Sequence, residues 1–319
     1  MANKCDIKEF AAKLLKEKSV AVFCHVHPDG DTLGSACALK IALNKKGIKA
    51  DVFCADPVPE KYLFLPEIAA IKSTISGEYS AFIACDNAEI SRLGGFADSF
   101  SEVPNTFNID HHVSNCRYAK YNYVAERSSN AENVFDLMNA IGVAADKDTA
   151  DLLALGLITD TGNFRHKNVT EETFACAEKL IAAGADFNRI YYYAFVRQSR
   201  GRAALHAKVM SKIRYFEDGK IAVITVSLAD LNETGAKPDE TEGFIDFVMG
   251  IEGVKVGVCL METEKDKYKV SLRSESADVN AVASVFGGGG HKLASGCRIS
   301  AEYEEAVDMI VSAVRRFLD

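Results

Sequence analysis

The sequence of 319 residues contains no tryptophan, only 6 prolines and no run of 18 apolar residues. The lack of such a run argues against a helix that spans a membrane. The 9 cysteines include no C-x-x-C pair and lie mostly in apolar stretches, which is typical of reduced, buried thiols. The net charge of −8 argues against broad binding of long nucleic acid, which needs clustered Lys and Arg. We therefore expect a cytoplasmic protein that binds neither membranes nor long nucleic acid.

Short apolar runs alternate with segments of helical period over residues 1–190, the expected first domain. This pattern predicts an α/β fold with a parallel sheet and helices on both of its faces. The expected strands are 19–25, 49–54, 80–85 and 106–109, and the expected helices are 32–46, 131–141, 147–158 and 170–183.

A polar and basic stretch, residues 191–204, is expected to connect this domain to a second one. The second domain, residues 205–319, should be a smaller mixed α+β unit, and we expect the active-site cleft between the two domains. Its expected strands are 221–227, 254–261 and 268–273, and its expected helices lie near 240–250, 278–285 and 302–318.

Acidic residues and histidines follow four of the apolar runs in the first domain. Ligands of parallel sheets bind beyond the carboxyl ends of the strands, so these side chains are expected in one crevice. Taken singly, an aspartate at such a position is more often a turn former or a helix N-cap than a ligand. The coincidence at four places favours a shared site, formed by His25, Asp29, Asp31, Asp86, Asp110, His111, His112 and Asp160.

Carboxylates that lie this close together repel one another unless a cation sits between them. A donor set of carboxylates and imidazoles without a thiolate suits manganese or iron better than structural zinc. The sequence also lacks a G-x-S-x-G motif, and the only cysteine beside a histidine of the site is Cys24, which we interpret as a buried strand residue. Water is therefore the expected nucleophile at a metal site.

These motifs, in this order, resemble those of the DHH phosphoesterase superfamily. The resemblance implies two Mn²⁺ ions, with Mg²⁺, Co²⁺ or Fe²⁺ as alternatives. It assigns His25, Asp29 and Asp86 to one metal and Asp31, Asp86, His111 and Asp160 to the other. It also implies that His112 faces the substrate phosphate and that Asp110 supports the histidines.

The second domain contains Gly287–Gly290 followed by His291, which resembles the hallmark of the DHH-associated C-terminal domain. Read alone, a glycine run is more often a flexible loop than a binding site. The resemblance implies that Arg273 grips a terminal phosphate and that the other substrate-binding residues are Ser274, Gly288, Gly289, Gly290 and His291. One departure is Ser295, where the family usually has alanine, and we expect only a small packing change.

The two-domain layout is similar to members of the superfamily that hydrolyse oligoribonucleotides of about two to five nucleotides and convert 3′-phosphoadenosine 5′-phosphate to AMP. A single arginine clamp without a visible basic track would favour such short single-stranded RNA. The nearest alternative is a phosphodiesterase for dinucleotide signals such as pApA, pGpG or cyclic di-AMP. A nucleotide sensor that does not hydrolyse is the alternative from another class. The apolar helices of the first domain are compatible with either a homodimer or ordinary core.

Overall fold

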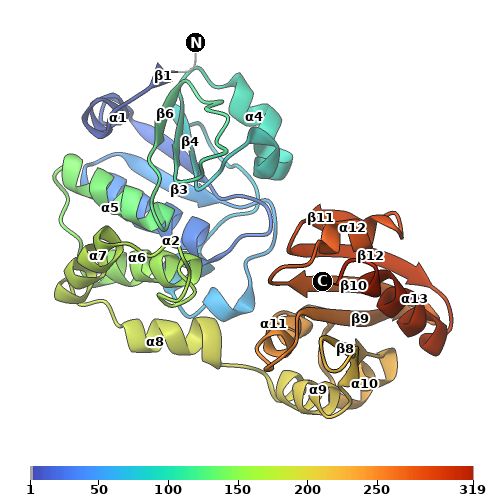
Figure 1. Ribbon diagram of the computed structural model, residues 1–319. Helices are drawn as coiled ribbons and strands as arrows, with labels where there is room; N and C mark the ends of the chain where they lie inside the picture. The colour runs from blue at the N-terminus through green and yellow to red at the C-terminus, as the bar shows by residue number, and fades with distance from the viewer. Residues whose placement is uncertain (1–2, 319) are drawn as a thin grey trace. The chain divides into compact units, whose positions relative to one another are not determined.

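The computed structural model describes residues 3–318, and the chain divides after Arg197 into two compact units (Figure 1). The first unit is built on a six-stranded sheet in which all neighbouring strands are parallel. The strand order is β1-β6-β5-β4-β2-β3. The strands are β1 (Asn3–Lys4), β2 (Ser19–Phe23), β3 (Lys49–Phe53), β4 (Ala81–Cys85), β5 (Thr106–Asp110) and β6 (Tyr121–Val124).

Helices cover both faces of this sheet, which explains why its central strands read as continuous apolar runs. Val20 and Val22 of β2 point into a core shared with the longer helices, whereas Ala21 and Phe23 pack under η2 and α4 on the other face. The helices are α1 (Ile7–Leu14), α2 (Gly30–Lys45), η1 (Glu60–Tyr62), α3 (Pro66–Ala69), η2 (Ile90–Phe96), α4 (Ala97–Glu102), α5 (Asn130–Ala140), α6 (Lys147–Asp160), α7 (Glu171–Ala182), α8 (Phe187–Tyr191) and the π-helical turn η3 (Tyr192–Val196).

The second unit contains a mixed sheet with the strand order β11-β12-β10-β9-β8-β7. Only β8 and β9 are parallel, and the other pairs are antiparallel. One face packs against α12 and α13, and the other packs against α9, α10 and α11. The elements are α9 (Arg200–Met210), β7 (Arg214–Phe216), β8 (Ile221–Val226), α10 (Leu228–Thr234), η4 (Pro238–Thr241), α11 (Phe244–Met249), β9 (Val256–Glu264), β10 (Lys267–Ser274), α12 (Val279–Ser284), β11 (Gly289–His291), β12 (Ala294–Ser300) and α13 (Tyr303–Arg315).

The α/β class with a parallel sheet and a second mixed unit is confirmed, but several elements were not predicted. Strand β6 contains the fully buried Asn122, whose amide bonds to the backbone of Ala119, so its sequence does not look like a core strand. Strand β12 and helices α1, α9 and α10 were also missed. The expected connection 191–204 is mostly helical, because η3 and the start of α9 leave only residues 197–199 outside a helix. Within residues 3–318, no helix combines the length and the apolar character that a membrane span requires.

Candidate metal centre

The carboxyl ends of β2, β4 and β5 and the last turn of α6 bring acidic residues and histidines together. His25 follows β2, Asp86 follows β4, and Asp160 is the last residue of α6. Helix α6 thus continues beyond the predicted range 147–158 and includes Asp160. Three overlapping groups have ligand atoms within 4.8 Å of one another: His25, Asp29 and Asp86; Asp31, His111 and Asp160; and Asp86, Asp110, His111 and His112.

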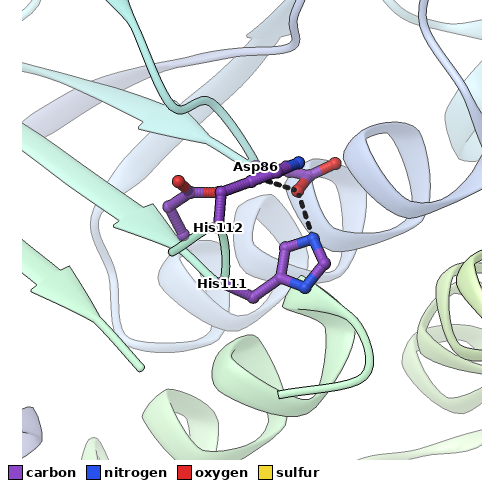
Figure 2. Close-up of side chains that lie close together, drawn as sticks. Asp86, His111 and His112 are labelled. Atoms are coloured by element: carbon purple, nitrogen blue, oxygen red, sulfur yellow. Dashed lines mark hydrogen bonds and ion pairs between the residues drawn. The ribbon is translucent and has the colours of Figure 1, made fainter. Parts of the chain in front are cut away.

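Asp86 lies between two histidines and is only 2% exposed. Its Oδ2 lies 3.6 Å from Nε2 of His25, and its Oδ1 lies 3.3 Å from Nε2 of His111. Figure 2 shows the second of these contacts, together with the longer approach of His112 Nδ1 at 3.7 Å from the same oxygen. The two oxygens of one carboxylate therefore face two different groups of ligand atoms.

Two buried atoms at the centre of this cluster lack a hydrogen-bond partner, namely Oδ1 of Asp86 and Nε2 of His111. The His111 atom lies 3.3 Å from a carboxylate oxygen of both Asp86 and Asp160, but it forms no aligned hydrogen bond to either. Buried polar atoms are normally satisfied, so a pair of orphaned atoms at such close range needs an explanation. A cation between them would accept one lone pair from Oδ1 of Asp86 and one from Nε2 of His111.

The electrostatics of the carboxylates point to the same conclusion. Burial, reinforced by the charges of Asp86 and Asp29, raises the pKa of Asp160 to about 7. Burial and the charges of Asp86 and Asp160 likewise raise the pKa of Asp31 well above its usual range. Keeping these carboxylates ionised together requires positive charge among them. The donor set of oxygens and imidazole nitrogens therefore fits a divalent cation.

Backbone carbonyls orient the two buried histidines. Nδ1 of His25 lies 2.8 Å from the carbonyl oxygen of Val26, and Nδ1 of His111 lies 3.1 Å from that of Arg127. Because a carbonyl oxygen can only accept, Nδ1 of His111 carries the hydrogen, and its Nε2 is directed at the carboxylates. Nδ1 of His25 faces both the Val26 carbonyl oxygen and a guanidinium nitrogen of Arg92, and its Nε2 is directed at Asp29 and Asp86. Burial lowers the pKa of His25, but Asp29 and Asp86 outweigh it and raise the pKa to about 10. A bound cation would have to displace these protons.

Asp31 caps a helix that follows it by a hundred residues. Its carboxylate accepts the backbone N–H of Asn130 at 2.5 Å and that of Ala131 at 2.9 Å, at the start of α5. The N-cap residue Ser129 makes no capping hydrogen bond of its own, so Asp31 stabilises the positive end of this helix from outside. A Cβ atom at Gly156 of α6 would lie 2.5 Å from Oδ1 of Asp31, so a glycine is needed there.

A buried polar network lies behind His112. Oδ1 of Asp110 bonds to Nδ1 of His112 at 2.8 Å, and Oδ2 of Asp110 accepts a hydrogen bond of 2.5 Å from Asn115. The same Asn115 amide nitrogen donates to Asn108 Oδ1 at 2.8 Å and to the carbonyl oxygen of Asn87 at 3.1 Å. These asparagines were not among the predicted site residues, although Asn108 inside the apolar run 106–109 was a usable signal.

Arg92 was also missed, and its Nη2 lies 3.2 Å from Nδ1 of His25. Its own carbonyl oxygen accepts a hydrogen bond of 2.7 Å from the Val26 N–H, which fixes η2 against the loop after β2. This residue places a guanidinium group beside the candidate metal centre.

The residues predicted to bind substrate in the second unit lie near the end of β10 and on β11. One guanidinium nitrogen of Arg273 donates to the carbonyl oxygen of Leu272 at 3.1 Å. The Ser274 hydroxyl donates to Lys255 O at 2.9 Å and accepts N–H groups from the turn that follows, so it holds the backbone of this turn. His291 is exposed, and its role and those of the neighbouring glycines stay predictions.

Comparison with known proteins identifies both units. A family model described as "DHH family, N-terminal domain" matches residues 19–157, and the model "DHHA1 domain" matches residues 218–319. A bifunctional oligoribonuclease and PAP phosphatase of Thermus thermophilus is 30% identical to this chain over 96% of the chain and 93% of that protein. The chain belongs to the DHH phosphoesterase family.

Two further relatives extend this result. A protein of the same description from Bacillus subtilis is 26% identical, with coverage of 86% of this chain and 87% of that protein. The crystal structure of an exopolyphosphatase-related protein from Bacteroides fragilis superposes with a TM-score of 0.86 at 25% identity, with coverage of 98% of this chain and 96% of that chain. The two-unit DHH architecture is therefore shared over nearly the whole chain.

Proposed function

We propose that this DHH phosphoesterase hydrolyses oligoribonucleotides of two to five nucleotides to mononucleotides and 3′-phosphoadenosine 5′-phosphate to AMP, with water as the nucleophile. The observation that carries the proposal is the carboxylate of Asp86, whose two oxygens face His25 and His111 separately. Such an arrangement suits a pair of metal ions that share one ligand. The names of the two oligoribonuclease relatives support the choice of substrate.

His25, Asp29 and Asp86 would hold one cation, and Asp31, Asp86, His111 and Asp160 would hold the other. Mn²⁺ is the proposed ion because carboxylates with a minority of imidazoles suit it well. When bound, the two cations would neutralise phosphoryl oxygens and lower the pKa of a water molecule between them. The chain's own contribution is to orient the imidazoles of His25 and His111 through the contacts of their Nδ1 atoms.

His112 is the proposed contact to the substrate phosphate. Asp110 holds Nδ1 of His112, and this hydrogen bond is the main reason why the pKa of His112 is raised. The protonated ring can then donate its Nε2–H to a phosphoryl oxygen, where negative charge develops during hydrolysis. Asn115 keeps Asp110 in place, because it donates to the oxygen that His112 does not use.

Arg273, Ser274, Gly288, Gly289, Gly290 and His291 form the proposed substrate-binding half in the second unit. Arginine suits the clamp role because its planar guanidinium group matches two phosphate oxygens at once. Ser274 would act mainly through the turn that it holds. Arg273 would bind a terminal phosphate of the substrate.

The experiment that tests this function is manganese-dependent turnover on a matched panel. The panel contains 5′-phosphorylated RNAs of two, three, five and twenty-four nucleotides, 3′-phosphoadenosine 5′-phosphate, cyclic di-AMP and pyrophosphate. Preference for the short RNAs, with activity on the bisphosphate, is the expected result. Activity confined to dinucleotides or to pyrophosphate would contradict the proposal, and binding without turnover would indicate a sensor.

A further inference from the structure

The register of the second sheet places four strands side by side on the face that carries Arg273. Residues that lie directly opposite each other on antiparallel strands point to the same side of the sheet. Arg273 of β10 lies opposite Ala294 of β12, which in turn lies opposite His291 of β11. Four residues away along β10, Lys269 lies opposite Arg298 of β12 and Met261 of β9. Because side chains alternate along a strand, Arg273 and Lys269 share one face.

Lys269 and Arg298 form a cross-strand pair of like charge. Both side chains are exposed, and within residues 3–318 neither forms an ion pair. Like charges directly opposite each other destabilise a sheet. Without an ion pair to an acidic side chain in this range, nothing offsets the repulsion between Lys269 and Arg298. Lys267, two residues away on the same face, shows the contrast, because its Nζ lies 2.8 Å from Glu264. An anion from outside the chain would compensate Lys269 and Arg298.

The row of residues between the two cationic positions on β10, β12 and β11 contains only small residues. Ser271 of β10 lies opposite Gly296 of β12, and Gly296 lies opposite Gly289 of β11. A Cβ atom at Gly289 would have Oδ1 of Asn280, at 3.7 Å, as its nearest neighbour, so packing does not demand a glycine there. No long side chain from this row of three therefore separates Arg273 from Lys269 and Arg298.

We propose that Lys269 and Arg298 bind a phosphodiester of an oligonucleotide whose other phosphate lies at Arg273. The two positions on β10 are separated by about 13 Å at the usual rise of a strand, which exceeds the length of one nucleotide unit. The pair therefore contributes to binding only when the substrate is longer than a dinucleotide. This inference rests on the proposed function. It replaces the single arginine clamp by two phosphate-binding positions. The strand register brings Lys269 and Arg298 together although they lie far apart in the sequence.

The test compares three single variants of the full chain: Lys269→Ala, Arg298→Ala and the matched control Lys267→Ala. Turnover is measured in manganese on RNAs of two and five nucleotides and on 3′-phosphoadenosine 5′-phosphate. We expect the KM for the pentanucleotide to rise about tenfold in each of the first two variants, because each loses a charge-assisted phosphate contact. The KM values for the dinucleotide and the bisphosphate should change less than twofold, and the control should match the wild-type chain on all substrates.

A binding measurement separates the inference from the proposed function. Fluorescence anisotropy of a labelled pentanucleotide in EDTA reports affinity without turnover, and the dependence of log Kd on log salt should become shallower by about 0.7 for each phosphate contact removed. Equal losses at both lengths, or an equal loss in Lys267→Ala, would overturn the inference, as would unchanged pentanucleotide binding in both test variants. Pentanucleotide binding that depends on Lys269 and Arg298, but without hydrolysis in manganese, would overturn the proposed function alone.

Discussion

Asp86 has a left-handed backbone conformation, with φ of 58°, that few residues other than glycine adopt readily. Aspartate and asparagine tolerate this region better than most residues because their short side chains bond locally. The tight turn places the carboxylate directly after β4, between His25 and His111. The position therefore needs both a tolerant backbone and two oxygens, and among the charged residues aspartate meets both needs best.

The substitution Asp86→Asn keeps the backbone preference and the shape but exchanges one oxygen for an NH₂ group. We expect the bound manganese to fall and the turnover of a short RNA to drop by about a hundredfold or more, because the amide nitrogen cannot act as a ligand. Metal content by mass spectrometry and steady-state kinetics measure the two effects. Asp98→Asn, which changes an exposed carboxylate on α4, is the control and should behave like the wild type. Near-normal turnover of Asp86→Asn would refute the shared-ligand arrangement.

Gly288 and Gly289 are neighbours with different requirements. A Cβ atom at Gly288 would lie 2.3 Å from the carbonyl oxygen of Gly296 and 2.5 Å from Cβ of Cys297, whereas a Cβ atom at Gly289 would make only an ordinary contact of 3.7 Å with Asn280. We expect Gly288→Ala to lower the free energy of unfolding by about 1–3 kcal/mol, because the backbone must shift. Gly289→Ala should leave stability within about 0.5 kcal/mol of the wild type and raise the KM for RNA. Urea denaturation and kinetics on both variants check this, and an unchanged KM in Gly289→Ala would remove this glycine from the substrate site.

At the scale of elements, α6 links the stability of the fold to the metal centre. The helix begins with a capping box between Asp146 and Thr149, packs closely on α2 through Gly156, and ends at Asp160. Gly34 of α2 takes part in the same contact, since a Cβ atom there would lie 2.2 Å from the carbonyl oxygen of Leu152. The close helix pair therefore sets where Asp31 and Asp160 lie relative to each other.

Asp146→Ala should cost about 1 kcal/mol in the free energy of unfolding at pH 7, because α6 loses its N-cap, whereas Asp146→Asn should keep the cap. Burial raises the pKa of Asp146, but the hydrogen bonds from Lys45 and Thr149 together outweigh it and lower the pKa to about 2. The stabilisation from this ionised carboxylate is thus complete above about pH 4 and is lost as the pH falls towards 2. The stability difference between the wild type and Asp146→Asn should shrink between pH 7 and pH 3 in urea denaturation. A constant difference would contradict this role of the charge.

At the scale of the whole molecule, the two units have separate hydrophobic cores. All the candidate metal ligands belong to the first unit, and the proposed phosphate-binding residues belong to the second. The division places the candidate metal ligands and the proposed phosphate-binding residues in units with separate cores. A ligand that binds only one unit need not stabilise the other unit against unfolding.

Manganese should therefore stabilise the two units unequally. At a concentration of about a hundred times its Kd, the ion adds roughly 2.7 kcal/mol to the state that binds it, which corresponds to about 5–10 °C for a unit of this size. We expect calorimetry to show a higher Tm for one transition and an unchanged Tm for the other, and we expect Asp86→Asn to abolish the shift. An equal rise of both transitions would show that the units unfold together.

The sequence by itself determined the α/β class, the family and the positions of His25, Asp86 and Asp110 at strand ends, whereas Asp160 lies at the end of helix α6. These features are local, because apolar runs form the central strands and the residues that follow them must lie at one edge of a parallel sheet. It missed strand β6, which contains Asn122, and the buried asparagines behind His112. Asn122 and Asn108 look polar in the sequence, yet both are fully buried, because partners distant in the chain or in a turn satisfy their amides.

Only the tertiary structure decided how the two oxygens of Asp86 are shared, which helix Asp31 caps and how Asn115 supports His112. It also decided that Lys269 and Arg298 are cross-strand neighbours. Each of these contacts depends on how the backbone places two residues and directs their side chains, which the spacing of residues in the sequence does not reveal. The physical reason is that hydrogen-bond geometry, helix packing through glycine and strand register are properties of pairs of elements, whereas a motif describes only one.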